Sequence, residues 1–414
     1  MTRSILIVGA SMGGLRAAEQ LRAVGWTESI TVVGDEVHMP YNRPPLSKKA
    51  LSMPLDATLQ QWHGETAFRI KRSTADVQWV LGSPAVTADV TNRTVELADG
   101  HRLSYDGLVV ATGLRPRRLP LAGAEDRRFV IRTIDDALAL RQRLKAGLTV
   151  GVIGGGFIGC EVAVTLAGTG HHVVVIEPMT TIMERALGTD VGLAIQNYHS
   201  THSGVAFHTG VALESIEETD DAVHLNLTDA SIIEVDVLVE SVGAMPNTEW
   251  LNGNGLDLTD GVLADNHLQV AGHPEIVAVG DAARFPNPRL GHQPRRIEHW
   301  CVPTDTAKQA ARSLVDHLNG HEPSQDVFAP MLSFWSDQGD LRLQSFGSPA
   351  LSERHDIAEG DPANPAAGLV IEYYTGARLT GVVLVNIPPT RHADFRHRVE
   401  HGYQPSTPTE GARP

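Results

Sequence analysis

The order of apolar and polar positions places two similar units in the chain. In the first, the apolar run SILIV at 4–8 leads into a glycine-rich turn, an amphipathic segment with apolar residues at helical spacing, and a second apolar run that ends near Asp35. Residues 148–178 repeat this order and end in an acid at Glu177. The pattern predicts strand, turn, helix and strand twice. Each unit has the length of a βαβ half of a dinucleotide-binding fold, about thirty residues.

Outside these units the pattern is more mixed. The segment between them is rich in short β patterns, and the run IVAVGDAARFP at 276–286 predicts another buried strand that leads into a Gly280–Asp281 turn. That turn would bring an acid to the ligand of the first glycine-rich turn, so that one dinucleotide domain is inserted into another, a flavoprotein arrangement. Further predictions are a strand in 236–243, helices at 303–318 and near 390–401, and a loop at 350–368.

The second glycine-rich turn carries the fingerprint Gly154, Gly156 and Gly159. The first glycine permits a tight turn, the second lets the backbone approach a pyrophosphate, and the third lets the helix pack on the strand. The phosphates would then meet the positive end of the helix. A bare structural turn is the alternative, but a strand before the turn, a helix after it and an acid at the expected distance favour a nucleotide site.

The first turn is less regular, since it reads Gly9, Ser11 and Gly14, with Gly13 alongside. Serine at the middle position still allows close approach and adds a hydroxyl donor. A purely structural turn stays open for this unit taken alone.

Asp35 and Glu177 each follow the second strand of a unit, where a carboxylate accepts hydrogen bonds from ribose hydroxyls. Such a charge also repels a 2′-phosphate by about a few kcal/mol near a protein surface. Glu177 therefore favours NAD over NADP. The alternative for either acid is an exposed charge at the end of a strand.

Composition narrows the functional classes. The chain has 414 residues and a net charge of −15, which disfavours binding to nucleic acid or anionic lipid. Its apolar runs are of strand length, and the first begins too early for a signal or transit peptide, so we expect a cytoplasmic protein without a membrane span. Only Cys160 and Cys301 occur, without a CxxC, which disfavours a metal site or a dithiol centre.

Seven motifs in order carry a family resemblance: PYNRPPLSK, ATGLRPR, GGGFIGCE, VGAMPNTE, AVGDAARFPNPRLG, RIEHW and FWSDQ. Together they resemble the FAD-dependent NADH:ferredoxin reductases of bacterial cytochrome P450 and aromatic-ring dioxygenase systems, the putidaredoxin reductase and biphenyl dioxygenase reductase type. The likeness extends over roughly residues 4–400.

The resemblance implies an α/β fold with two Rossmann-like dinucleotide-binding domains, as in glutathione-reductase-like flavoproteins, and a C-terminal α+β domain. The implied boundaries are an FAD-binding domain at 1–114 and 241–322, an NAD-binding domain at 115–240, a C-terminal domain at 323–405 and a disordered tail at 406–414.

The same resemblance implies the site residues. It places Arg43 and Lys48, on the stiff PPLSK segment, against FAD, with Lys48 near the reactive edge of the flavin and paired with Glu161; these two carry the catalytic role. The other implied FAD contacts are Gly9, Ser11, Gly13, Gly14, Asp35, Val86, Arg132, Gly280, Asp281, His299, Trp300 and Trp335. The implied NAD contacts, together with the second fingerprint, are Gly154, Gly155, Gly156, Phe157, Ile158, Gly159, Glu177, Gly243 and Glu298.

The resemblance implies an enzyme that passes electrons from NADH through FAD to an iron–sulfur ferredoxin of the two-iron type. The enzyme is expected to be a monomer or a homodimer. An NADH-dependent rubredoxin reductase or an NADH oxidase would use the same site. A redox-sensing binding protein similar to apoptosis-inducing factor is the alternative from another class; it would be expected to carry a basic surface. Two arginine groups, one at 289–296 and one in the last helix, are candidates to receive an acidic ferredoxin.

Overall fold

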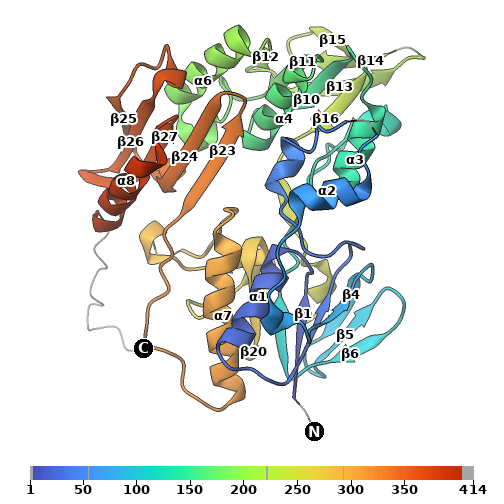
Figure 1. Ribbon diagram of the computed structural model, residues 1–414, viewed down its shortest axis with the longest axis vertical. Helices are drawn as coiled ribbons and strands as arrows, with labels where there is room; N and C mark the ends of the chain where they lie inside the picture. Colours follow the sequence, from blue (N-terminus) through green and yellow to red (C-terminus); the bar gives the residue numbers. More distant parts are fainter. Residues whose placement is uncertain (1–2, 55, 221, 292, 403–414) are drawn as a thin grey trace.

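The computed structural model describes residues 3–54, 56–220, 222–291 and 293–402, and Figure 1 shows their arrangement. In the lower half of that view lies a six-stranded sheet in the order β19-β20-β7-β1-β2-β3. Its strands are β1 (Ser4–Val8), β2 (Ser29–Val33), β3 (Gln78–Val80), β7 (Gly107–Val110), β19 (Gln269–Val270) and β20 (His273–Ala278). Strand β20 pairs in parallel with β7, so the chain returns to its first sheet after a long excursion, as the sequence predicts.

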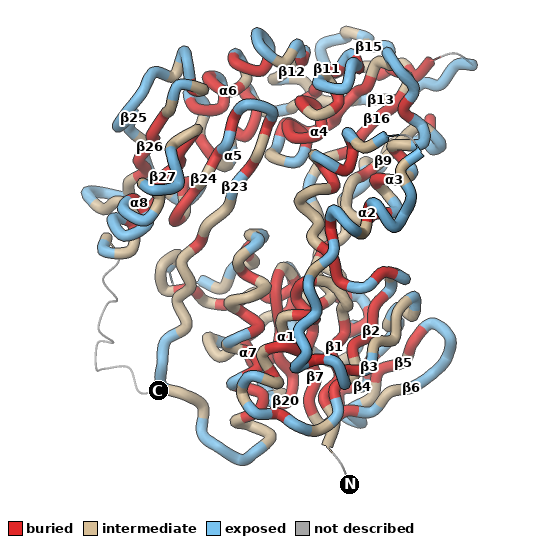
Figure 2. Tube along the Cα trace, in the orientation of Figure 1, coloured by how far each residue is buried: buried red, intermediate tan, exposed pale blue. Residues whose placement is uncertain are grey.

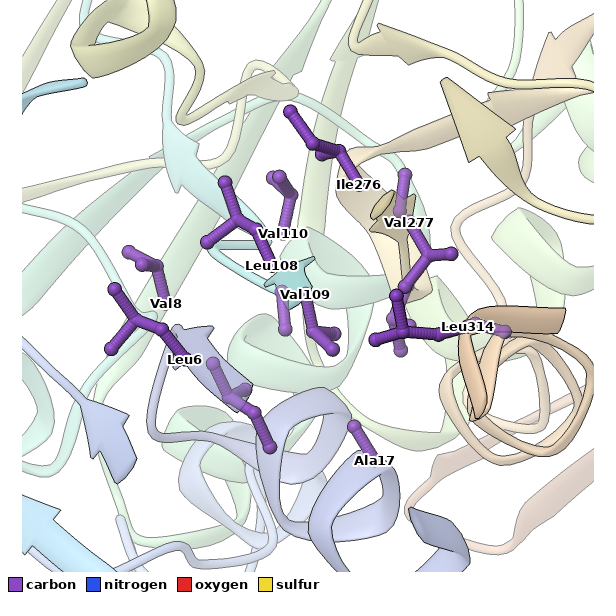
Figure 3. Packing of buried hydrophobic residues seen from close by; sticks show 14 of the residues in the cluster. Leu6, Val8, Ala17, Leu108, Val109, Val110, Ile276, Val277 and Leu314 are labelled. Atoms are coloured by element: carbon purple, nitrogen blue, oxygen red, sulfur yellow. The ribbon is translucent and has the colours of Figure 1, made fainter. Parts of the chain in front are cut away.

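Helices α1 (Met12–Ala23) and α7 (Val302–Leu318) lie side by side against this sheet (Figure 1). Their apolar faces enter one buried cluster with the strands, in which Ala17 and Leu314 lie beside Leu6 and Val277 (Figure 3). Leu314 is 0% exposed. This packing fixes the first glycine-rich turn, because that turn joins β1 to α1.

The second parallel sheet has the order β12-β11-β10-β16-β9. Its strands are β9 (Arg128–Phe129), β10 (Thr149–Ile153), β11 (His172–Glu177), β12 (Ala206–Thr209) and β16 (Val237–Glu240). Helices α3 (Ile134–Arg143), α4 (Phe157–Gly168) and α6 (Thr189–His202) accompany it. Strands β10 and β11 with α4 form the βαβ unit predicted from residues 148–178.

Small sheets and short helices complete these two parts. The antiparallel pair β8 (Leu114–Pro116) and β17 (Ala244–Pro246) lies where the chain enters and leaves the second part. The other elements are β4 (Ala85–Asp89), β5 (Thr94–Leu97), β6 (Arg102–Ser104), β13 (Leu213–Glu218), β14 (Val223–Leu227), β15 (Ile232–Val235), β18 (Val262–Leu263), β21 (Ala283–Phe285), β22 (Arg295–Arg296), α2 (Leu59–Thr66) and α5 (Glu184–Leu187).

The C-terminal part is a five-stranded antiparallel sheet with helix α8 (Pro389–His401). The sheet order is β23 (Ser333–Gln338), β24 (Leu341–Gly347), β27 (Arg378–Val385), β26 (Leu369–Thr375) and β25 (Arg354–Glu359). The expected loop at 350–368 is wrong in part, because β25 lies within it. This strand is at the sheet edge and mostly exposed (Figure 2), so its sequence lacks apolar alternation.

One mostly parallel and one parallel sheet with helices, together with a separate antiparallel sheet, confirm the predicted α/β fold class. The predicted domain boundaries stay predictions, and the tail at 406–414 lies outside the described residues. No helix in the described part of the chain is long and apolar enough to cross a membrane.

Candidate active site

A cleft of about 1130 Å³ lies among the three parts of the fold. Its lining includes both glycine-rich turns, the PPLSK segment, the Gly280–Asp281 turn, residues 298–300 and strand β23. This volume exceeds the range typical of pockets for a single small ligand, about 300–1000 Å³. The cleft can therefore accept more than one extended molecule.

The two glycine-rich turns have the same geometry. Gly9 and Gly154 have positive φ angles of 120° and 102°, which favour glycine. A Cβ on Gly14 would collide with the carbonyl oxygen of Gly9, and a Cβ on Gly159 would collide with that of Gly154. The steric reasons predicted for the first and third glycines therefore hold in both units.

The middle positions face the cleft. A Cβ on Gly156 would meet nothing within 4 Å, and Gly156 lines the cleft at the start of α4. Ser11 has the equivalent place before α1 and also lines the cleft, and its side chain makes no capping hydrogen bond. Both helix N-termini thus present open backbone N–H groups to the cleft, where an anionic group would be stabilised.

The PPLSK segment forms a short 3₁₀ helix, η1 (Pro44–Ser47), which ends at Lys48. The Nζ atom of Lys48 lies 2.8 Å from Oε2 of Glu161 on α4, whose side chain is only 6% exposed. Ser47 Oγ donates to the same oxygen at 2.6 Å. The rigid prolines thus hold a cation against a buried carboxylate at the cleft wall.

A second charged group lies along the PPLSK and Gly280–Asp281 sides of the cleft. Arg43 pairs with Glu36 and donates to the backbone oxygen of Arg132. Arg132 in turn places Nη2 3.6 Å from Oδ2 of Asp281. Burial raises the pKa of Asp281, and burial together with the nearby Arg43 lowers the pKa of Arg132.

Aromatic rings line the side of the cleft next to β23. Phe334 lies 4.8 Å from Phe157 and 5.3 Å from His299 between ring centroids. Trp300 and Trp335 meet edge to face at 5.3 Å at the rim, where both are partly exposed. Burial lowers the pKa of His299 to about 4, so its ring is neutral at pH 7.

Most of the predicted site residues line this one cleft. They are Ser11, Gly13, Asp35, Arg43, Lys48, Arg132, Gly156, Phe157, Ile158, Glu161, Gly243, Gly280, Asp281, Glu298, His299, Trp300 and Trp335. The remaining predicted glycines, Gly9, Gly14, Gly154, Gly155 and Gly159, shape the two turns behind the lining.

Glu177 lies behind Gly155 and outside the lining. Its two carboxylate oxygens accept hydrogen bonds from the backbone N–H groups of Gly155 at 2.7 Å and Met179 at 2.8 Å. The acid is therefore fixed at the end of β11, beside the second glycine-rich turn, and its role towards a ribose stays a prediction.

Val86 does not line the cleft, and its contact with FAD stays a prediction. Its side chain is 49% exposed on β4, and only Ala88 of that strand is buried. The strand belongs to the small β4-β5-β6 sheet, and its pairing with β5 shifts register between Ala85 and Thr87. Val86 lies at this bulge, so it does not share the buried face of Ala88.

Sequence reasoning missed four residues of the site: Glu36, Ser47, Phe334 and Ser336. Ser336 Oγ donates to Oε1 of Glu161 at 2.7 Å. The period of two along a strand was the available signal, because Phe334, Ser336 and Gln338 share one face of β23 while Trp335 lies on the other.

Neither cysteine lines the cleft. The Cys160 thiol contacts the backbone oxygen of Gly155 at 3.5 Å inside the fold, and burial raises its pKa. Burial also raises the pKa of Cys301, whose sulfur lies 3.5 Å from the backbone oxygen of Ser333. A raised pKa lowers the thiolate fraction and hence the reactivity of both groups.

Comparison with known proteins agrees with this geometry. Residues 3–307 match the family described as pyridine nucleotide-disulphide oxidoreductase, and residues 333–409 match a reductase C-terminal family. The chain is 33% identical to putidaredoxin reductase of Pseudomonas putida, over 93% of this chain and 89% of that protein. It is 35% identical to the ferredoxin--NAD(+) reductase component of the p-cumate 2,3-dioxygenase system of Pseudomonas putida, over 93% and 90%.

A solved structure extends the likeness to the fold. The covalent putidaredoxin reductase–putidaredoxin complex matches with a TM-score of 0.85 at 30% identity, over 96% of this chain and 93% of that one.

Proposed function

We propose that this chain, which belongs to the pyridine nucleotide-disulphide oxidoreductase family, is an FAD-dependent ferredoxin--NAD(+) reductase. It passes electrons from NADH to an iron–sulfur ferredoxin that serves a cytochrome P450 or a ring-hydroxylating dioxygenase. The observation that carries the proposal is the Lys48–Glu161 pair at the wall of the cleft. Both glycine-rich turns line this cleft, whereas neither cysteine does.

The residues of the first unit fit FAD. Ser11 and Gly13 offer the N-terminus of α1 to the pyrophosphate, and Asp35 is exposed at the end of β2 to meet a ribose. Near the flavin, His299 has a buried Nδ1 without a hydrogen-bond partner in the described part of the chain, and Lys48 and Arg132 supply positive charge. When bound, FAD can accept a hydride and release electrons one at a time.

The residues of the second unit fit NADH. Gly156 leaves open space at the N-terminus of α4, and Gly243, with a φ of 97°, also has open space on its cleft side. Phe157 and Phe334 form an apolar wall between the two units. Glu177, held by two backbone N–H groups, favours NADH by repelling a 2′-phosphate.

Each side chain at the reaction centre then has a physical task. Glu161 keeps the Lys48 ammonium in place, and that cation stabilises negative charge beside it. Neutral His299 and the Trp300–Trp335 pair cover the site and restrict water. No side chain has to act as a nucleophile or as a general base.

The electron acceptor that we propose is a ferredoxin of the two-iron type, and the enzyme a monomer or homodimer. The arginine groups expected to receive it are largely neutralised within the chain. Arg296 pairs with Asp260 and Glu298, and in α8 the partners are Glu359 for Arg391, Glu400 for Arg396 and Glu372 for Arg398. Arg295 is exposed in the cleft lining and is the better candidate for steering an acidic partner.

The domain division that we propose follows the sheets: 1–114 with 241–322 for FAD, 115–240 for NAD, and 323–405 for the C-terminal domain. Strand β20 in the first sheet and the β8–β17 pair at the crossing support these divisions.

An NADH titration of the purified protein followed by absorbance tests the function. We expect a flavin spectrum that NADH bleaches, and cytochrome c reduction that depends on added two-iron ferredoxin. A protein that cannot be reconstituted with FAD would overturn the proposal. Rapid NADH oxidation by oxygen without any response to ferredoxin would instead indicate an NADH oxidase, and a response to rubredoxin alone would indicate a rubredoxin reductase.

A further inference from the structure

A chain of buried polar side chains leads away from the cleft, starting at Glu161. Ser336 Oγ donates to Glu161 Oε1 at 2.7 Å, and Gln338 Nε2 donates to Ser336 Oγ at 3.0 Å. His199 Nε2 lies 2.9 Å from Gln338 Oε1. Ser336, Gln338 and His199 are each 0% exposed. No step of the proposed function uses the last two of these residues.

The chemistry of the groups fixes the direction of every link. A carboxylate only accepts, so the Ser336 hydroxyl must donate its proton to Glu161. The serine oxygen then accepts from the amide of Gln338, whose carbonyl is left facing His199. His199 must therefore carry its proton on Nε2.

His199 meets that requirement without a charge. Burial lowers its pKa, so the ring is neutral at pH 7. Its other nitrogen, Nδ1, lies 3.2 Å from Ser203 Oγ, which can donate to it. One neutral tautomer satisfies both contacts, and the whole chain points its donors towards Glu161.

The two oxygens of Glu161 thus have separate partners. Oε2 receives Lys48 and Ser47 from the PPLSK side, whereas Oε1 receives Ser336 from β23 of the C-terminal sheet. A carboxylate held at both oxygens cannot rotate, so its position also fixes the ammonium that it pairs with.

We propose that Ser336, Gln338 and His199 are positioning residues that hold Glu161 so that it aims Lys48 at the reaction centre. The role of the aimed lysine rests on the proposed function, whereas the alignment itself is a property of this chain. Gln338 and His199, which do not line the cleft, thereby act through Ser336 on the geometry of the Lys48–Glu161 pair at its wall.

Chemical labelling of Lys48 tests the alignment without any turnover. Lys48 is 18% exposed, so acetic anhydride can reach it, and mass spectrometry can compare its labelling with that of the exposed Lys145 in the full chain stripped of bound nucleotide. We expect S336A and H199L to raise the relative labelling rate of Lys48 by about threefold or more, as loss of one hydrogen bond of ordinary strength predicts. Unchanged labelling in both variants would overturn the proposal.

Two matched variants separate alignment from general loosening. H199Q retains an N–H donor for Gln338 and should restore labelling to within about twofold of the wild-type rate. His202 lies one turn further along α6 and stacks on Tyr198, outside the chain of donors, so H202L should leave labelling unchanged. Equal increases in H202L and H199L would indicate loosening of α6 and overturn the proposal; if H199L does not fold, S336A still decides.

Kinetics of the flavin-loaded enzyme supply the second test. S336A should lower the rate constant for reduction of the bound flavin by about threefold or more, with the KM for NADH unchanged, because it acts through Lys48. In a K48M background the same substitution should have no further effect. An additional loss there would overturn the proposal. Failure of the wild-type chain to bind FAD or oxidise NADH would overturn the proposed function alone, since the labelling result is independent of both.

Discussion

Arg132 and Asp281 pair within the cleft lining, and their side chains lie 3.6 Å apart between Nη2 and Oδ2. The arginine lies between β9 and α3, whereas the aspartate follows β20, so the contact joins the part built on the second sheet to the part built on the first. Asp281 stays costly to ionise despite this partner, because burial raises its pKa.

That shift predicts a pH dependence of stability with a definite sign. A group whose native pKa is raised stabilises the fold while it is protonated, and this stabilisation is lost as pH rises from about 4 through the native pKa. We therefore expect D281N, relative to wild type, to gain in free energy of unfolding as pH increases from 4 to 7 in the flavin-free chain. Urea unfolding at several pH values measures the difference. A constant difference between the two proteins over that range would contradict the assignment.

Cofactor selectivity depends on the charge of Glu177. Its two oxygens accept from Gly155 and Met179, so E177Q keeps a side chain of the same shape at the end of β11 while it removes the negative charge. Loss of a repulsion of about a few kcal/mol should raise the ratio of kcat/KM for NADPH to that for NADH by about tenfold or more.

The matched control for this prediction is D35N, which removes the equivalent acid of the first unit. Its ratio of NADPH to NADH use should equal that of wild type, although its affinity for FAD should fall. A wild-type enzyme that already prefers NADPH would rule out the role assigned to Glu177.

Removal of the Lys48 ammonium should harm the reaction more than the fold. In K48M, Glu161 still accepts hydrogen bonds from the hydroxyl groups of Ser47 and Ser336, so the buried carboxylate keeps two donors. We expect the free energy of unfolding to fall by about 1–3 kcal/mol, below the cost of a fully unpaired buried charge, while reduction of the bound flavin by NADH slows by about tenfold or more.

The neighbouring Lys49 provides the comparison, since its side chain is 68% exposed and pairs with Glu65 at the surface. K49M should change neither quantity measurably, because exposed ion pairs contribute about 0–1 kcal/mol. Flavin reduction at the wild-type rate in K48M would remove the catalytic role of this lysine.

Sequence reasoning predicted the parts of the site that depend on local rules. Gly154 and Gly159 follow from the turn and the helix that they join, and Lys48 with Glu161 follows from motifs that the family resemblance carried. The alternation along β23 was visible as well, but nothing local says that Ser336 meets Glu161, since the contact forms only when the C-terminal sheet packs against α4.

Two features of the sheets could not be predicted from local sequence. The exposure of Val86 follows from a bulge in the pairing of β4 with β5, which leaves this residue without a register partner in β5. Strand β25 was missed because an edge strand without a buried face has no apolar alternation to reveal it. Both features depend on which surfaces pack together, and that information lies outside any short stretch of sequence.

Electrostatic steering of the ferredoxin should depend on Arg295 more than on the arginines of α8. Arg295 is exposed and lies in the cleft lining, whereas Arg391 is engaged with Glu359 through both terminal guanidinium nitrogens. A charge that is already paired within the chain exerts little electrostatic attraction on a partner. The attraction of an unpaired charge is screened over about 10 Å at 0.1 M salt.

We therefore expect R295E to lower kcat/KM for ferredoxin by about threefold or more at low ionic strength and to flatten its salt dependence, while R391E leaves that dependence close to wild type. Cytochrome c reduction coupled to ferredoxin over a range of salt concentrations measures both variants, and reduction of a small uncharged acceptor should be the same in each. An identical salt response in R295E and wild type would show that the acidic partner docks elsewhere.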